Sequence, residues 1–233
     1  MKCDFSVKHY QEILEKALKD DFKIINFQKL KKAQKSSKII LLRHDIDCSP
    51  RRALEIAKIE NNLKIKSTFF VRVHGEFYHP FDRITFPVLK EIIKMGHEIG
   101  LHTEARNLAL EFKMNMIDLF KIEKKILETM LSIKIESASE HADFGRTKDY
   151  WTNHFFTKVK KEKVGIKNFP QEKRFQEFHY LSDSLGHWRE GCLCQNFQKY
   201  QYIQALIHPD HWGKNACLEL KKLRACNNLG NIL

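Results

Sequence analysis

Long hydrophobic runs are missing from this sequence of 233 residues. The first twenty residues alternate charged and apolar groups, so they lack the uninterrupted apolar core of a signal peptide. No later stretch approaches the roughly 20 apolar residues that a membrane-spanning helix needs. We therefore expect a protein without a membrane span and predict a cytoplasmic location.

Proline and glycine are also scarce, with 5 and 9 residues, and no stretch rich in proline, glycine or serine divides the chain. We interpret residues 1–233 as one domain, with residues 1–35 as a helical extension packed on it. The 42% hydrophobic content, with 17 phenylalanines, is ample for a core.

The six cysteines do not have the spacing of a zinc ribbon. Cys192 and Cys194 could join Cys217 and Cys226 in a second zinc site, but buried or incidental thiols are the simpler interpretation. Reduced thiols are also the default in the cytoplasm.

Acidic residues are outnumbered, at 29 against 41 lysines and arginines, which gives a formal net charge of +12. Such a charge attracts polyanions, namely nucleic acid, acidic glycans or a membrane surface. The lysines are spread through the predicted helices, however, and no nucleic-acid recognition motif is present. We expect no specific nucleic-acid partner, and a nucleic-acid binder stays an alternative that rests on charge alone.

Residues 38–71 organise the rest of the chain. Residues 38–42 are predicted to form a short buried strand, with titratable side chains crowded at its exit: Arg43, His44, Asp45 and Asp47. Two carboxylates and an imidazole in such a place can hold a divalent metal or move a proton. Ser49 as N-cap and Pro50 as first residue then predict a helix.

Further strands are predicted to alternate mostly with helices. The predicted strands are residues 68–71, 98–101, 133–139, 164–166, 178–181 and 202–207. Residues 5–30 are predicted to form one or two helices, and further helices are predicted at 87–95, 108–130 and 218–223. Polar residues collect where strands end: Asp45, Asp47, His102, His141, Asp183 and His208. In a closed or nearly closed parallel β/α barrel these ends meet at one mouth, where such enzymes place their active sites. The pattern predicts an α/β fold.

Two motifs carry a resemblance to a known family. The first runs from Asp45 to the sequence Ser-Thr-Phe-Phe-Val at residues 67–71, and the second is Gly-His-Glu-Ile-Gly-Leu-His-Thr at residues 96–103. They resemble the polysaccharide deacetylases, the NodB-like carbohydrate esterases, and two motifs in the right order are far more specific than one. The form Arg-His-Asp-Ile-Asp resembles a branch found with surface-polysaccharide biosynthesis. Weaker similarity extends to His208.

The resemblance implies a distorted seven-stranded parallel β/α barrel and metal-dependent removal of an acetyl group from an acetylated sugar or glycan. By motif position Asp45 is the base, His208 is the general acid, and Asp183 orients His208 and keeps it protonated. The same carboxylate next to an imidazole raises the pKa of that imidazole. The alternative for Asp45 is a structural acid that caps a helix or pairs with Arg43 or Arg51.

For the metal, the resemblance implies Asp47 and His102 as ligands. The family's usual third ligand falls on Arg106 here, and arginine cannot bind a metal. We expect His141 to replace it, with Glu104 as the second candidate. Zinc is the expected metal, with cobalt, nickel or manganese as alternatives.

Substrate contacts are predicted for Trp188 and Trp212, by stacking on a sugar ring, and for Arg43. Residues 74–82 form a candidate substrate-facing loop. Two other functions stay open: an amidase acting on a non-sugar C–N bond, and a metal-free binding protein of the same fold. The sequence does not determine the oligomeric state.

Overall fold

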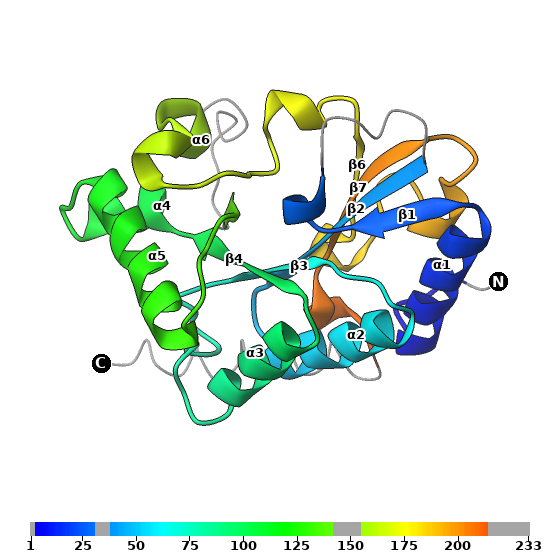
Figure 1. Ribbon diagram of the computed structural model, residues 1–233, viewed down its shortest axis with the longest axis horizontal. Coiled ribbons are helices and arrows are strands. Elements are labelled where there is room, and N and C mark those ends of the chain that lie inside the picture. The colour runs from blue at the N-terminus through cyan, green and yellow to red at the C-terminus, as the bar shows by residue number, and fades with distance from the viewer. Residues whose placement is uncertain (1–2, 31–37, 142–154, 214–233) are drawn as a thin grey trace.

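Seven parallel strands form a single sheet in the computed structural model, which describes residues 3–30, 38–141 and 155–213 (Figure 1). Cys217, Cys226 and the predicted helix at residues 218–223 lie outside the described residues. The strands are β1 (Phe22–Ile25), β2 (Lys38–Ile46), β3 (Thr68–Val71), β4 (Glu98–Thr103), β5 (Ala138–Glu140), β6 (His179–Ser182) and β7 (Tyr202–Ile207).

The sheet has the order β5-β4-β3-β2-β7-β6, and β1 pairs with the first half of β2. Every pairing is parallel. Within the described ranges no ladder joins β5 to β6, so the sheet curls without closing (Figure 1). The predicted α/β class with a distorted parallel barrel is confirmed, in the form of an open barrel.

Helices cover the outer side of the curled sheet. They are α1 (Val7–Lys19), α2 (Pro50–Asn62), α3 (Thr85–Lys94), α4 (Ala105–Glu111), α5 (Met116–Leu131) and α6 (Phe155–Lys158). Helix α1 packs on α2, α2 on α3 and α3 on α5, which makes an arc around the sheet (Figure 1). Short 3-10 helices are η1 (Phe27–Lys29), η3 (Lys161–Val164), η4 (Lys173–Phe175), η5 (Ser184–Gly186), η6 (Leu193–Gln195) and η7 (Pro209–His211). No helix among these described segments has the length and apolar character to cross a membrane.

Helix α2 starts as the sequence predicts. The Ser49 side chain accepts a hydrogen bond from the Arg52 backbone N–H at 3.4 Å, and Pro50 follows at the first position. Its buried face presents Ala53, Ile56 and Ala57 to the main core. This cap directs the chain straight from β2 into the helix.

Alternation along β2 divides the interior into two parts, because successive side chains of a strand point to opposite faces. Ile40, Leu42 and Ile46 belong to the large core shared with the helices. Leu41 instead joins a small cluster with Phe27, Phe70 and Phe175 on the other face. Arg43 and Asp45 continue that second face toward the carboxyl edge of the sheet.

Gly100 allows β4 to lie against this second cluster. A Cβ atom at Gly100 would lie 2.5 Å from the ring of Phe70 and 2.9 Å from the Ser137 carbonyl oxygen. Only a residue without a side chain fits there, which accounts for the glycine inside this strand.

Two predicted helices are corrected. Residues 5–30 form α1 followed by β1, because Asp21 takes a left-handed turn (φ 63°) and the next four residues alternate in burial like a strand. The predicted helix at 108–130 is two helices, since the chain turns at Lys113 (φ 53°) and the Asn115 side chain caps α5.

The strand predictions also change in detail. Residues 164–166 form no strand, because the chain there leaves the 3-10 helix η3 through Gly165 in the left-handed region (φ 65°). The predicted strand at 133–139 is reduced to β5. Strand β2 is longer than predicted, so Arg43, His44 and Asp45 lie within the strand rather than after it.

Candidate active site

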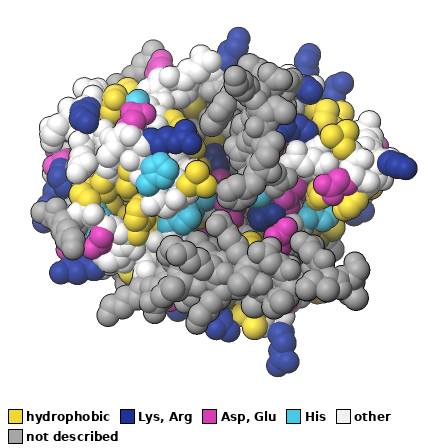
Figure 2. Space-filling model, turned by 180° about the vertical axis from the view of Figure 1, so that it is seen from behind, with side chains coloured by type: hydrophobic (Ala, Val, Ile, Leu, Met, Phe, Trp, Pro, Cys, Tyr) yellow, Lys and Arg dark blue, Asp and Glu magenta, His cyan; other side chains and the backbone are white. Residues whose placement is uncertain are grey.

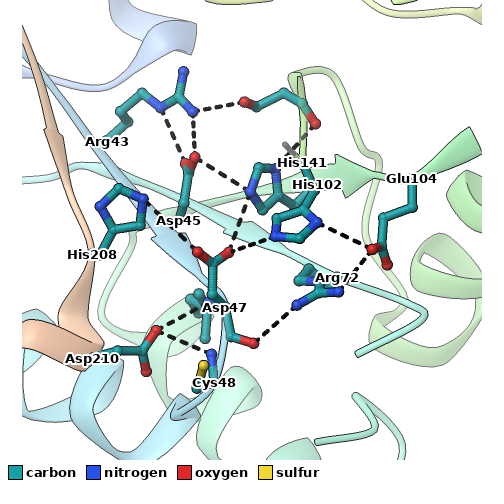
Figure 3. Close-up of polar contacts among 12 residues, drawn as sticks. Arg43, Asp45, Asp47, Cys48, Arg72, His102, Glu104, His141, His208 and Asp210 are labelled. Atoms are coloured by element: carbon teal, nitrogen blue, oxygen red, sulfur yellow. Dashed lines mark hydrogen bonds and ion pairs between the residues drawn. The ribbon is translucent and has the colours of Figure 1, made fainter. Parts of the chain in front are cut away.

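Three predicted metal ligands meet at the carboxyl edge of the sheet (Figure 3). Asp47 follows β2, His102 lies in β4, and His141 follows β5. The Nε2 atom of His102 is 3.4 Å from Asp47 Oδ1, and the Nε2 atom of His141 is 3.8 Å from the same oxygen. One ligand atom from each residue lies within 4.8 Å of the others. Side chains far apart in the sequence therefore face a common point.

The two imidazoles are aimed at that point by acceptors on their other nitrogen. His102 Nδ1 is 3.2 Å from the backbone oxygen of Ser139, and His141 Nδ1 is 3.1 Å from Glu104 Oε1. A carbonyl or carboxylate oxygen can only accept, so each Nδ1 donates. In a neutral ring, Nε2 then presents its lone pair toward Asp47, which is how metal-binding histidines are usually oriented.

A divalent cation fits this arrangement. Asp47 Oδ1 is buried and receives no hydrogen bond from the described residues, although buried polar atoms nearly always have a partner. Two imidazole lone pairs and this carboxylate oxygen repel one another unless a positive charge lies between them. Two nitrogens and one oxygen form a donor set suited to zinc.

Asp45 lies beside this cluster and is held by Arg43. The Arg43 guanidinium donates to both carboxylate oxygens, with Nε 3.1 Å from Oδ1, and it also donates to Ser139 Oγ at 2.7 Å. The other oxygen of Asp45 is 3.3 Å from His102 Nε2. Burial raises the pKa of Asp45, but Arg43 and His102 outweigh burial and hold the pKa below its usual range. The group is therefore an ionised carboxylate next to the candidate metal ligands.

His208 and Asp183 form the predicted pair. Asp183 Oδ1 is 2.6 Å from His208 Nδ1, and the same carboxylate accepts from the His208 backbone N–H and, at 2.7 Å, from Trp212 Nε1. Burial lowers the pKa of His208, but Asp183 outweighs it and raises the pKa to about 9. The other nitrogen of His208 points to Asp47, 3.8 Å from its Oδ2 (Figure 3).

Asp210 is a site residue that the sequence analysis missed. Its carboxylate accepts backbone N–H bonds from Asp47 at 3.2 Å, Cys48 at 3.0 Å and Ser49 at 2.5 Å. Burial raises the pKa of Asp210 to about 7, and the charge of Asp47 adds to that shift. The sequence position of Asp210 could have indicated this role. Asp210 lies two residues beyond His208 and shortly after a strand, as do other acidic residues of the candidate site.

Arg106 and Glu104 stay out of the cluster. The Nε atom of Arg106 is 2.7 Å from Glu140 Oε1, so this positive charge is paired. Glu104, the second candidate ligand, contacts Arg72 at 2.7 Å and His141 at 3.1 Å. It supports the His141 ring instead of reaching the point where the ligands converge.

Three other predictions about side chains are corrected. The Trp212 ring is 0% exposed, so it cannot stack on a sugar, and it supports Asp183 instead. Arg43 is buried and its hydrogen bonds hold Asp45, so it is a positioning residue rather than a free substrate contact. His44 points to the opposite face of β2, where its Nε2 is 2.6 Å from Glu60. Trp188 is half-buried against the main core.

Three side chains of the candidate site are partly exposed. The exposed fractions of the Asp47, His141 and His208 side chains are 26%, 14% and 13%. In Figure 2, histidine and acidic side chains come to the surface in the central part of the face, and lysines and arginines are scattered over the face and around its outline.

Comparison with known proteins gives similarity in structure only. No protein-family model matches the chain, and no curated protein is significantly similar to it. Among solved structures it is similar to IcaB from Ammonifex degensii, with 13% identity over 90% of this chain and 87% of the other and a TM-score of 0.49.

Two further solved structures are similar at the same level. A family 4 carbohydrate esterase from Bacillus anthracis is 14% identical over 99% of this chain and 90% of the other, with a TM-score of 0.45. The deacetylase PplD from Streptococcus pyogenes, in complex with acetate, is 14% identical over 57% of this chain, with a TM-score of 0.41. This chain spans 63% of the length of PplD.

Proposed function

We propose that this protein is a metal-dependent hydrolase that removes an acetyl group from an acetylated sugar. The observation that carries the proposal is the meeting of Asp47, His102 and His141 beside an ionised carboxylate and a protonated imidazole. The two sequence motifs that resemble the polysaccharide deacetylases support the same chemistry. We also propose that the sugar belongs to surface-polysaccharide biosynthesis, as the Arg-His-Asp-Ile-Asp motif suggests.

Asp47, His102 and His141 would hold the metal, with zinc the first choice for two imidazoles and one carboxylate. When bound, a divalent metal acidifies water and polarises the acetyl carbonyl. Three protein ligands leave coordination positions free for water and substrate, as a hydrolytic site requires. The remaining chemistry falls to the residues that surround the ligands.

We assign to Asp45 the role of accepting the proton of the attacking water, and the hydrogen bonds by which Arg43 holds the ionised carboxylate support this role. We assign to His208 the role of giving a proton to the leaving nitrogen or oxygen of the sugar, and its pairing with Asp183, which favours the protonated ring, supports this role. The water supplies the oxygen of the released acetate, and the leaving group departs with the proton of His208.

Metal content of purified variants tests the ligand assignment. We expect His141→Ala to lose metal about as completely as His102→Ala, because each removes one of three ligands. Glu104→Gln is the matched control: it keeps an acceptor for His141 Nδ1 and should retain most of the metal. Full occupancy in His141→Ala would contradict the assignment.

Acetate release from a panel of N- and O-acetylated sugars tests the reaction. We expect metal-dependent release from at least one sugar, abolished in His102→Ala. Cleavage of non-sugar amides without release from any sugar would favour the amidase alternative. A metal-free wild-type protein without activity would instead favour a binding protein of the same fold.

A further inference from the structure

A second group of metal-binding side chains lies outside the candidate active site. Cys3 Sγ is 3.6 Å from Cys194 Sγ, which is 3.5 Å from Cys192 Sγ. His9 Nε2 is 3.3 Å from Cys192 Sγ, and all four ligand atoms lie within 4.8 Å of one another. No residue of this group contributes to the candidate active site.

The four residues come from two segments that are distant in the sequence. Cys3 precedes α1 and His9 lies in its first turns, whereas Cys192 caps the 3-10 helix η6 and Cys194 lies within it. Cys3, Cys192 and Cys194 are free thiols. Three sulfurs and one imidazole nitrogen from opposite parts of the chain are thus gathered at one point.

The spacing of these atoms fits a tetrahedral zinc ion. With Zn–S bonds of about 2.3 Å and Zn–N bonds of about 2.0 Å, a tetrahedron separates two sulfurs by about 3.8 Å and sulfur from nitrogen by about 3.5 Å. The observed separations of 3.5, 3.6 and 3.3 Å are close to these values. Three cysteines and one histidine are also a common ligand set of structural zinc sites.

The surroundings of these four residues also support a zinc ion. The His9 side chain is 2% exposed, and its Nδ1 atom has no hydrogen bond to the described part of the chain but lies 3.5 Å from Glu12 Oε2. A carboxylate on the far nitrogen is the usual partner of a metal-bound histidine.

We propose that Cys3, His9, Cys192 and Cys194 form a structural zinc site. Four protein ligands leave no position for substrate, so the ion would tie α1 to the segment that leads into β7. Helix α1 also covers Trp212, with the Tyr10 and Trp212 ring centroids 5.2 Å apart, and Trp212 holds Asp183. The ion would therefore stabilise the part of the fold that carries His208.

The test uses the full chain with the candidate active-site ligands removed. In the His102→Ala/His141→Ala variant we expect about one zinc per chain, because the cysteine site has its own four ligands. Adding Cys192→Ser should reduce this zinc at least tenfold. Cobalt in place of zinc should give the strong visible and near-ultraviolet absorption of tetrahedral thiolate coordination, and Cys3→Ser, at an exposed residue, should change that spectrum while the protein stays folded.

Cys217→Ser/Cys226→Ser in the same background is the matched control. We expect it to keep its zinc, because those cysteines are not among the four ligands. If this control loses its zinc while Cys3→Ser and His9→Ala keep theirs, the proposal is overturned. Cys217 and Cys226 would then be the partners of Cys192 and Cys194. A protein without zinc in the His102→Ala/His141→Ala background, or an intact mass two hydrogens short from a disulfide among these cysteines, would also overturn it.

Discussion

At the scale of single residues, each histidine of the candidate active site is oriented by an acceptor on its Nδ1 atom. His102 faces a backbone carbonyl, and His141 faces the Glu104 carboxylate, which Arg72 already neutralises in part. His208 faces Asp183, and no lysine or arginine of the described residues forms an ion pair with that carboxylate. The strong pairing of His208 favours its charged form, so we infer that this ring handles protons while the other two are ligands.

His208→Ala should leave metal binding intact and lower the turnover number about 10²- to 10⁴-fold, the usual contribution of general acid–base catalysis. The reason is that the leaving group then has no positioned proton donor. Steady-state kinetics with metal analysis on the same sample checks this. His179→Ala, at the opposite end of the neighbouring strand, is the control and should keep its turnover. Unchanged turnover in His208→Ala would exclude the acid role.

Asp183→Asn should shift the alkaline limb of the pH profile of kcat/KM to lower pH. Asp183 raises the pKa of His208 to about 9, so the folded protein holds this proton up to that pH. Removing the carboxylate charge lowers the pKa, and the proton is then lost at lower pH.

The control for this pH experiment is Asp118→Asn, on an exposed turn of α5, which should leave the profile unchanged. An alkaline limb at the same pH in Asp183→Asn and wild type would show that His208 is not the titrating acid.

At the scale of elements, the carboxyl edge of the sheet gathers the site because neighbouring strands are parallel. Strand β2 supplies Asp45 on the face away from the helices and then Asp47 just beyond its end. Asp210, from the segment after β7, accepts hydrogen bonds from backbone N–H groups of the segment that follows β2. The turn that carries Asp47 is thus fixed by a neighbouring element as well as by the helix cap at Ser49.

Gly100→Ala should destabilise the protein by about 1–3 kcal/mol, the usual cost of overpacking a well-packed core. The added methyl group would lie 2.5 Å from the Phe70 ring. Urea unfolding measures the change. Gly100→Ala/Phe70→Leu should recover part of the loss, because the smaller side chain relieves the clash. A midpoint equal to that of wild type in Gly100→Ala would contradict the close approach.

At the scale of the whole molecule, the net charge of +12 is spread over the surface, and Figure 2 shows lysines and arginines scattered around one face. The acidic and histidine side chains of the candidate active site are concentrated instead. We interpret the positive charge as a general surface property and the cluster as the functional feature.

Binding to duplex DNA should accordingly be weak and should fall steeply between about 50 and 200 mM salt, as expected for counterion release without base contacts. Fluorescence anisotropy with two duplexes of unrelated sequence measures this. Equal affinities for both duplexes are expected. A complex that prefers one sequence and survives physiological salt would contradict this interpretation.

The sequence by itself determined the features that depend on neighbours along the chain. Ser49 and Pro50 identify the start of α2, and short apolar runs that end in polar residues identify most strands, because caps and apolar runs are local properties. Parallel strands also bring their ends together, so Asp47, His102 and His141 could be named as a group before their distances were known.

The tertiary structure decided what depends on contacts across the fold. Sequence position did not distinguish Trp212, buried on Asp183, from a surface ring that stacks on a sugar. The cysteine group depends on the fold in the same way, since Cys3 and His9 meet Cys192 and Cys194 only after α1 has packed beside η6. Ligand sets, burial and ion pairs arise between distant segments, and no local pattern in the chain records which segments will meet.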